Sequence, residues 1–304
     1  MTFKRLLYVL PAIAALLLTF SCGDDDNKGI SWGNNGGGGT VTPSRELTSR
    51  METPRVLTDG STTLIGHFVT TGGAKTVLDY SVEYDTQQYH SRWVAFRFDG
   101  DTRAKNVSRP NPDPFADDPL LASQYHIGSN GFGWDYNRGH LCASADRLFS
   151  LEACVQTFYM TNMSPQLGSF NQGYWITLEN LIQNKGRNAS FADTLYVVKG
   201  GTILSNQING YITRSNGKKV AIPKYYFTAL LKVKNGVYSS IAFWMEHKEY
   251  GYTYNSPAPL SEIKKTVVSV NRLEQLTGID FFPNLPDDKE EIIEDQNVPG
   301  SWGM

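Results

Sequence analysis

The stretch Tyr136-Asn137-Arg138-Gly139-His140 holds the residue types on which the rest of the chain depends. It is expected to form a strand, in which residues two apart point to the same face, so Arg138 and His140 would project together. Gly139 would face the other way and let another backbone approach closely. The guanidinium disfavours a second positive charge and keeps the imidazole neutral, in the form that accepts a proton from water. Because a guanidinium also holds phosphate with a forked pair of donors, the stretch suits phosphodiester hydrolysis, although the Arg-Gly-His tripeptide alone is common.

The N-terminus has the pattern of an export signal. Lys4 and Arg5 precede an apolar run, residues 6–20, which ends at Ser21-Cys22 and is short for a membrane span of ~20 residues. The cysteine resembles the lipobox of bacterial lipoproteins, which predicts a signal peptide over residues 1–21 and a lipidated Cys22 that anchors the chain to a membrane. The acidic residues 24–26 are similar to the export signal of outward-facing outer-membrane lipoproteins. We therefore expect an exported bacterial lipoprotein of the outer membrane, facing the periplasm or the surface; the alternatives are an uncleaved anchor and a solvated acidic spacer.

Charge and cysteine content limit the function further. The chain has 304 residues and a net charge of −2, and without residues 1–21 it keeps 26 basic against 30 acidic residues, a net charge of −4. A protein that stores or packages nucleic acid would be basic, whereas an enzyme that releases its product needs only a local basic patch. Cys142 and Cys154 remain beside Cys22, and export would permit them to pair. The sequence leaves this pairing open, and no other residue marks a cysteine-hydrolase site at Cys142.

Composition divides the chain into three segments after the signal peptide. Residues 22–53 are rich in Gly, Asn, Asp and Thr, which predicts a tether. Residues 54–286 form one block that is long enough for a large domain. Residues 287–304 are acidic, which predicts a frayed tail. A long functional loop is expected at residues 100–133. Strands are expected at residues 64–69, 76–84, 92–98, 136–142, 158–163, 195–198, 225–233 and 237–245. Turns are expected at Gly72-Gly73 and, as a hairpin turn, at Lys234-Asn235-Gly236. A second helix is expected at residues 261–276, with Ser261 as its N-cap and Gly278 as its stop.

The clearest amphipathic helix runs from Asn171 to Ile182. Its apolar side chains recur on one face, at Trp175, Leu178, Leu181 and Ile182. A helix N-terminus favours anions, and the carboxamide oxygen of Asn171 in the first turn is a hard ligand suited to Mg²⁺. Glu179 would lie ~12 Å further along an ideal helix and ~80° around it. We therefore expect Glu179 to hydrogen-bond a water of the ion or a neighbouring side chain rather than share direct coordination, unless the helix bends.

Three motifs, in this order and spacing, resemble one known family. They are Arg138-Gly139-His140, Asn162-x-x-Pro165-Gln166 and Asn171-Gln172-Gly173-x-Trp175-x-x-Leu178-Glu179. Together they closely resemble the DNA/RNA non-specific endonucleases, the sugar-non-specific group with a ββα-metal active site that includes mitochondrial endonuclease G. The resemblance continues through Ile222-Pro223 and residues 277–283 and covers roughly residues 65–286. It implies an α+β fold with a central, mostly antiparallel sheet flanked by helices.

The resemblance also implies roles for the matching residues. His140 falls on the general base of the family, and Asn171 on the protein ligand of a single Mg²⁺, for which Mn²⁺ would substitute. Arg138 falls on the family arginine that binds substrate, and Glu179 on the glutamate of the helix motif. Asn162 matches an active-site asparagine with a supporting role.

Two positions fit the family less closely. The family uses an upstream arginine ahead of an Asp-Pro, and Arg109 before Asp118-Pro119 is the candidate for binding substrate, although the spacing here is longer. Asn137 stands where the family usually has aspartate. On a strand it would face away from His140, so we expect a structural role there and a weakened pair with some other cation.

These features predict a metal-dependent endonuclease that hydrolyses DNA and RNA with little sequence specificity. The resemblance implies products with 5′-phosphate ends, and contacts mainly to the backbone would explain a lack of base selectivity. Two alternatives stay open: a catalytically weak or inactive surface lipoprotein of the same fold that binds nucleic acid, and a phosphodiesterase for small nucleotides. The sequence does not reveal a preference between DNA and RNA, the oligomeric state or the biological role.

Overall fold

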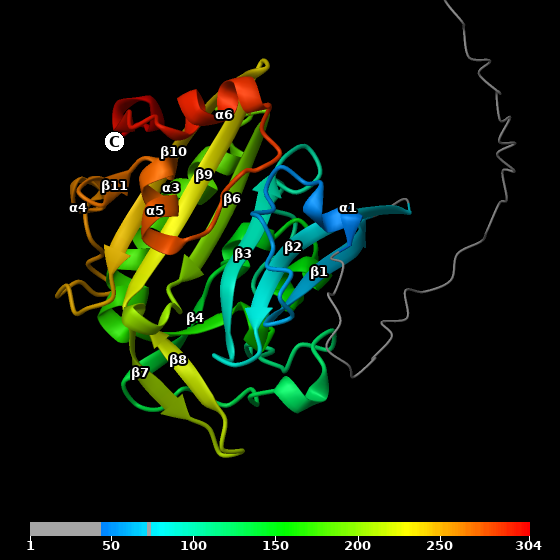
Figure 1. Ribbon diagram of the computed structural model, residues 1–304, viewed down its shortest axis with the longest axis vertical. Coiled ribbons are helices and arrows are strands. Elements are labelled where there is room, and N and C mark those ends of the chain that lie inside the picture. The colour runs from blue at the N-terminus through cyan, green and yellow to red at the C-terminus, as the bar shows by residue number, and fades with distance from the viewer. Residues whose placement is uncertain (1–43, 72–73) are drawn as a thin grey trace, which may run out of the picture. The chain divides into compact units, whose positions relative to one another are not determined.

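The fold is built on one large antiparallel sheet with helices on both faces. The computed structural model describes residues 44–71 and 74–304. Within these residues, seven strands form a sheet in the order β1-β2-β3-β6-β9-β10-β11, and the pairs β4–β5 and β7–β8 form separate antiparallel ladders (Figure 1). The strands are β1 (Thr62–Thr71), β2 (Lys75–Asp85), β3 (His90–Phe98), β4 (Tyr136–His140), β5 (Met163–Leu167), β6 (Thr194–Gly201), β7 (Ile208–Thr213), β8 (Lys219–Pro223), β9 (Tyr225–Lys234), β10 (Val237–Glu246) and β11 (Val267–Val268). The predicted α+β class with a central antiparallel sheet is confirmed.

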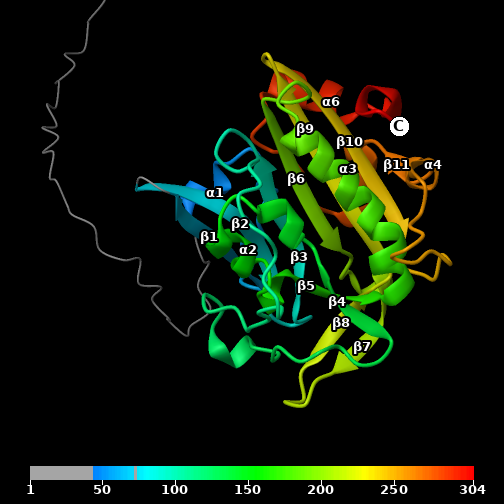
Figure 2. The same ribbon diagram turned by 180° about the vertical axis from the view of Figure 1, so that it is seen from behind.

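The helices divide between the two faces of the sheet. They are α1 (Arg45–Thr48), α2 (Leu151–Gln156), α3 (Ile176–Arg187), α4 (Leu260–Lys264), α5 (Val270–Thr277) and α6 (Asp287–Glu294). Helix α3 covers the face seen in Figure 2, whereas α5 and α6 lie on the face seen in Figure 1. No helix in the described part of the chain combines the length and the apolar character that crossing a membrane requires.

Alternation along the central strands explains how both faces are buried. On β6 and β9, Val197 and Leu230 belong to the core that contains α3, while their neighbours Val198 and Ala229 belong to the core that contains α5. Side chains of successive strand residues point to opposite faces, so a strand covered on both sides reads as a continuous apolar run. The sheet therefore holds α3 in place through one of its faces.

The ladder β4–β5 and the following helix form the ββα unit that positions the motif residues. β4 pairs with β5 in antiparallel register, with Gly139 opposite Ser164 and His140 opposite Met163. A π-helix, Phe170–Trp175, follows β5 and continues directly into α3. The expected amphipathic helix at 171–182 is thus present but begins one residue earlier, with a wider turn, and ends at Arg187.

Several expected strands and turns differ from the structure. The strand predicted at 158–163 is wrong: Met160–Asn162 is a 3₁₀ turn, and β5 begins only at Met163. The strand predicted at 136–142 ends at His140, so Cys142 does not share its face; Cys142 and Cys154 are buried free thiols. The turn predicted at Gly72-Gly73 lies outside the described residues. The loop predicted at 100–133 is confirmed, with one short 3₁₀ turn at Ser123–Tyr125.

The single helix predicted at 261–276 is divided in two. Val267 and Val268 form β11 and pair with β10, because branched residues pack well on a pleated surface. Ser269, not Ser261, caps the second helix by accepting a hydrogen bond from the backbone N–H of Arg272. Gly278 stops that helix in the left-handed conformation, with φ of 67°, as predicted.

Both ends of the described chain belong to the fold. The tail expected at 287–304 instead forms α6 and a 3₁₀ turn at Pro299–Trp302, because Ile293 and Trp302 are buried. Likewise, residues 44–53 of the expected tether are folded, and the side chain of Leu47 packs against Gly66 of β1. Composition misled both expectations, polar and glycine content for the tether and acidic content for the tail, since a few apolar anchors suffice to fix such a segment.

Candidate active site

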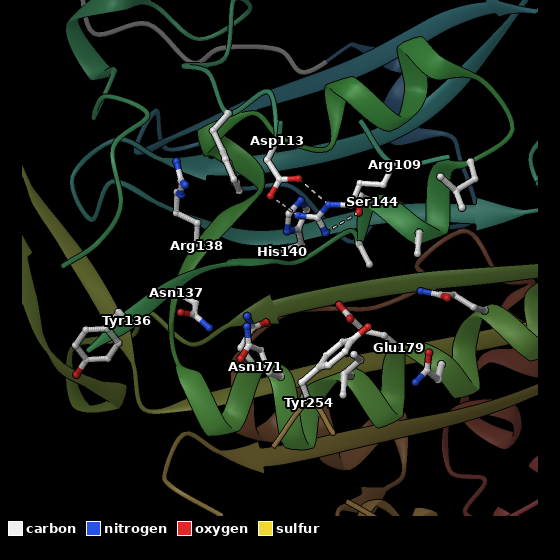
Figure 3. A pocket seen from close by; sticks show the side chains of 18 of the residues that line it. Arg109, Asp113, Tyr136, Asn137, Arg138, His140, Ser144, Asn171, Glu179 and Tyr254 are labelled. Carbon is white, nitrogen blue, oxygen red and sulfur yellow. Dashed lines mark hydrogen bonds and ion pairs between the residues drawn. The ribbon is translucent and has the colours of Figure 1, made fainter. Parts of the chain in front are cut away.

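The predicted site residues gather in one open cleft of about 610 Å³. Its floor and sides come from the loop after β3, from β4, and from the π-helix with α3. Figure 3 shows His140, Arg109 and Asp113 on one side of the cleft and Asn171, Glu179 and Tyr254 on the other. Five predicted residues line it together: Arg109, Arg138, His140, Asn171 and Glu179.

His140 is held as a neutral base. Its ring packs edge-on against Phe158 at 4.9 Å between centroids, and Phe115 lies at 6.0 Å. Burial, followed by the positive charge of Arg109, lowers the pKa of His140 to about 3, while Asp113 opposes the shift. Nε2 of the ring is buried and lacks a hydrogen-bond partner among the described residues. Because a buried nitrogen without a partner is costly, this atom is suited to accept a hydrogen bond from a ligand or water.

Arg138 projects into the cleft with His140, as the strand periodicity predicts. Its guanidinium stacks on Phe115 at 3.5 Å from the ring centroid and donates a hydrogen bond to the carbonyl of Ser129 at 2.6 Å. The remaining N–H groups stay open to the cleft. Arg138 contributes less to the low pKa of His140 than burial or Arg109 does, so our expectation of its electrostatic role was too strong.

Gly139 permits close contact with a side chain rather than with a backbone. A Cβ atom at this position would lie 2.1 Å from Oε1 of Gln166, which is fully buried on β5. The absence of a side chain thus lets β4 and β5 approach closely. This contact fixes the position of the two residues on either side of Gly139.

Arg109 lies in the cleft, but its fork is occupied by a residue that the motifs did not reveal. Nε and Nη2 donate to the two carboxylate oxygens of Asp113 at 2.8 and 2.6 Å, and Nη1 donates to the hydroxyl of Ser144 at 3.2 Å. This pairing lowers the pKa of Asp113. Asp118, which belongs to the Asp-Pro that we used to identify Arg109 in the sequence, is buried elsewhere and its carboxylate lies 2.9 Å from Nε2 of His67.

The π-helix brings Asn171 and Glu179 closer to one face than an ideal α-helix would. A π-turn rotates each residue by less than the ~100° of an α-helix, so the ~80° expected between these two side chains becomes smaller. Both line the cleft. Gly173, within the wide turn, is packed against the backbone of Tyr252, where a Cβ atom would approach to 2.4 Å. The loop after β10 therefore stabilises the turn that presents Asn171.

A buried ion pair lies beneath Glu179. Nζ of Lys199 on β6 is 3.2 Å from a carboxylate oxygen of Asp146, and both side chains are fully buried. Burial raises the pKa of Glu179 to about 7; Lys199 counteracts this shift, and Asp146 adds to it. Glu179 is therefore divided between its two protonation states near neutral pH. Sequence motifs gave no signal for Lys199, because its partner lies 53 residues away.

Asn162 does not enter the cleft, contrary to its predicted place in the active site. It is fully buried, and its Nδ2 donates to the carbonyls of Cys142 and Thr157 at 2.8 and 2.6 Å. Its Oδ1 accepts from the backbone N–H of Cys142 at 2.8 Å. Asn162 therefore fixes the backbone just after His140, which is a supporting role of a structural kind. Asn137, expected to face away, lines the cleft as well.

The donor atoms of the cleft fit a hydrated divalent cation. Among residues 44–71 and 74–304 there is no group of three or more His, Cys, Asp or Glu that could hold a metal ion. The carboxamide of Asn171 lines the cleft and offers a hard oxygen, and Glu179 offers a second one. Mg²⁺ keeps several waters and uses only one or two protein oxygens, so this set suits it. The predicted lipidation site, Cys22, lies outside the described residues.

Comparison with known proteins agrees with this arrangement of hairpin, histidine and helix. The family model for DNA/RNA non-specific endonucleases matches residues 59–288. The chain belongs to the DNA/RNA non-specific endonuclease family. The crystal structure of the EndoG/EndoGI complex has the same fold, with a TM-score of 0.58 and 22% identity over 83% of this chain and 96% of that chain.

Individual relatives share about a quarter of the aligned residues with this chain. The mitochondrial nuclease EXOG of Mus musculus is 27% identical over 68% of this chain and 56% of its own length. Endonuclease G of Homo sapiens is 26% identical over 68% of both chains, and a nuclease of Nostoc sp. is 27% identical over 71% of this chain and 75% of its own. The chain thus spans only a little over half of the mouse EXOG relative.

Proposed function

We propose that this protein is a metal-dependent endonuclease that hydrolyses phosphodiester bonds of DNA and RNA with little sequence specificity. The observation that carries the proposal is the convergence of His140 and Asn171 on one cleft from the two halves of the ββα unit. Membership of the endonuclease family supports it. The names of the relatives, all nucleases, point to the same chemistry.

His140 acts as the general base in this proposal. Its neutral ring accepts a proton from water at Nε2 while the water oxygen forms a bond to phosphorus and the bond to the 3′ oxygen breaks. The resulting product carries a 5′-phosphate. The negative charge of a bound phosphodiester raises the pKa of the imidazole above its value in the free protein, which improves it as a base near neutral pH.

Arg138 and Arg109 hold the phosphate. Arg138 presents the N–H groups that Ser129 does not occupy. Arg109 has to exchange the carboxylate of Asp113 for a phosphate, which has similar acceptor geometry. Both residues of that ion pair are more than a third exposed, so the exchange costs little. Asp113 thus keeps Arg109 ordered until substrate binds.

Asn171 and Glu179 provide oxygen ligands and orientation on the helix side. When bound there, Mg²⁺, or Mn²⁺ in its place, would neutralise the charge that builds on the phosphate and on the departing 3′ oxygen. Asn171 contributes the direct protein oxygen. The pKa of Glu179 is about 7, and its carboxyl group can hold a water or a neighbouring group by a hydrogen bond both when it is protonated and when it is ionised.

A plasmid-nicking assay tests the proposal. The purified protein should convert supercoiled plasmid to nicked and linear forms with Mg²⁺, should degrade single-stranded RNA under the same conditions, and should do neither in EDTA. Binding of nucleic acid without cleavage would favour the inactive binding protein. Cleavage of a dinucleotide in preference to long DNA would favour the small-nucleotide phosphodiesterase.

We also propose that the protein is an exported bacterial lipoprotein of the outer membrane, anchored through Cys22. The basic start, the apolar run and the cysteine after Ser21 support this. Labelling cells with a fatty-acid analogue should modify the wild type and not Cys22→Ser. A labelled Cys22→Ser protein, or a wild type that stays soluble after export, would contradict the anchor.

A further inference from the structure

The loop before β4 presents a fully exposed tryptophan beside the cleft. Trp134 lies between Gly131 and Tyr136, and both of these residues line the cleft. Trp93, Trp175 and Trp302, in contrast, are fully buried. A single exposed aromatic side chain needs no partner in itself, so the relevant observation is its position between two cleft-lining residues, which makes its ring available to a ligand in the cleft.

This loop is fixed, so the exposure of Trp134 does not result from a loosely packed segment. The guanidinium of Arg214, which follows β7, donates hydrogen bonds of 2.6–3.0 Å to four backbone carbonyls of the loop: those of Ile127, Gly128, Asn130 and Gly131. Phe132 is buried, and the guanidinium of Arg214 lies 5.2 Å from its ring centroid. Two residues further on, Trp134 points outward from this fixed base.

A second exposed aromatic residue lines the cleft itself, on the side of the helix. Tyr254 lines the cleft near Asn171 and Glu179 and is 67% exposed (Figure 3). Its loop is fixed by Tyr250, which stacks on Tyr174 at 3.9 Å between ring centroids. The hydrogen bond from Ala258 N–H to the carbonyl of Gly173 also ties this loop to the π-helix. Two anchored loops, one before β4 and one after β10, thus present exposed aromatic side chains at or next to the cleft.

We propose that Trp134 and Tyr254 stack on unpaired bases on either side of the scissile phosphate, so that the cleft takes single-stranded DNA or RNA in preference to duplex. The inference rests on the proposed nuclease function and adds its substrate class. Every base offers a free face for stacking when the strand is single, whereas in a duplex the bases already stack on one another. The preference is therefore independent of sequence.

The charges of the cleft agree with this preference. Duplex binding depends mainly on many cation–phosphate contacts. Here the fork of Arg109 is paired with Asp113, and Arg138 is partly used by Ser129 and Phe115. Among the described residues only two arginines, Arg109 and Arg138, line the cleft, enough to hold one phosphate but few for a duplex, so stacking would add the remaining affinity.

Binding can be measured without cleavage in the full chain carrying His140→Ala. A labelled oligonucleotide, alone or annealed to its complement, is titrated by fluorescence anisotropy. Adding Trp134→Ala or Tyr254→Ala should weaken single-strand binding about ten-fold each and leave duplex binding unchanged. The dependence of affinity on salt should keep its slope, because no phosphate contact is lost.

Tyr211→Ala is the matched control, since Tyr211 is 48% exposed on β7 and does not line the cleft. Unchanged thermal unfolding shows that each variant is folded, and Trp134→Phe should retain most of the single-strand affinity. Variants that bind single strands like the parent, or that lose duplex binding equally, overturn the stacking proposal. If the wild type fails to nick any substrate with Mg²⁺, the nuclease proposal fails instead, whatever the binding result.

Discussion

Replacing Gly139 with alanine tests how tightly the site depends on contact between β4 and β5. The new methyl carbon would lie 2.1 Å from Oε1 and 2.6 Å from Cγ of Gln166, which is fully buried and cannot turn to solvent. Overpacking of this kind costs about 1–3 kcal/mol, and a loss of about 2 kcal/mol lowers the Tm of a domain this large by about 4–8 °C. Because Arg138 and His140 flank Gly139, a shift of about 1 Å in β4 should reduce turnover about 100-fold.

A second substitution isolates the cause. Gln166→Ala removes the three atoms that the new methyl group would meet, so the double variant should regain most of the stability and turnover that Gly139→Ala loses. Thermal unfolding and plasmid nicking of both single variants, the double variant and the wild type complete the cycle. If the losses of the two single variants simply add in the double variant, the contact with Gln166 is not what Gly139 protects, and the reasoning is refuted.

Three further outcomes are expected. His140→Ala should lose about 10²–10⁴-fold in turnover at an unchanged Tm, and a folded, active variant would exclude it as the base. Asn171→Ala should raise the Mg²⁺ concentration for half-maximal nicking; unchanged metal dependence would tell against this ligand. Burial raises the pKa of Glu294 from 4.5 to about 9, so the folded state keeps a proton that the unfolded state releases, and stability falls as pH rises between these values. Glu294→Gln should flatten that fall and add about 1–3 kcal/mol at pH 8 in chemical denaturation, whereas an unchanged pH profile would exclude Glu294 as its source.

The site could be predicted where its residues are close in sequence. Arg138 and His140 share a strand face, as local periodicity predicts, and Asn171 and Glu179 share a helix, although the wide turn that brings them closer to one face was not predicted. The antiparallel sheet also followed from branched and aromatic runs. The strand predicted at residues 158–163 was placed too early because Phe158 was taken as a strand residue, whereas its ring packs against the ring of His140.

The parts that sequence did not reveal depend on distant contacts. Lys199 pairs with Asp146 under the cleft, and no spacing marks that pair as part of a site. Asp113 is the exception, because it lies four residues after Arg109 and precedes Pro114, an Asp-Pro closer to Arg109 than the one we chose. Trp302 was placed in a frayed tail, although its ring is buried 5.5 Å from Phe191. The interactions that stabilise Lys199 and Trp302 come from residues that are brought close only by folding, so the local sequence pattern does not predict them.

The wide turn at Phe170–Trp175 imposes a constraint on chain length. The rotation of Asn171 relative to Glu179 depends on the number of residues between them, and inserting one residue would change it by roughly a quarter turn, ~100°. Substitutions at exposed positions of the turn would leave that rotation unchanged. Insertion scanning should therefore find residues 170–175 far less tolerant of one added residue than of point changes, whereas the surface hairpin at Lys234–Val237 should accept both.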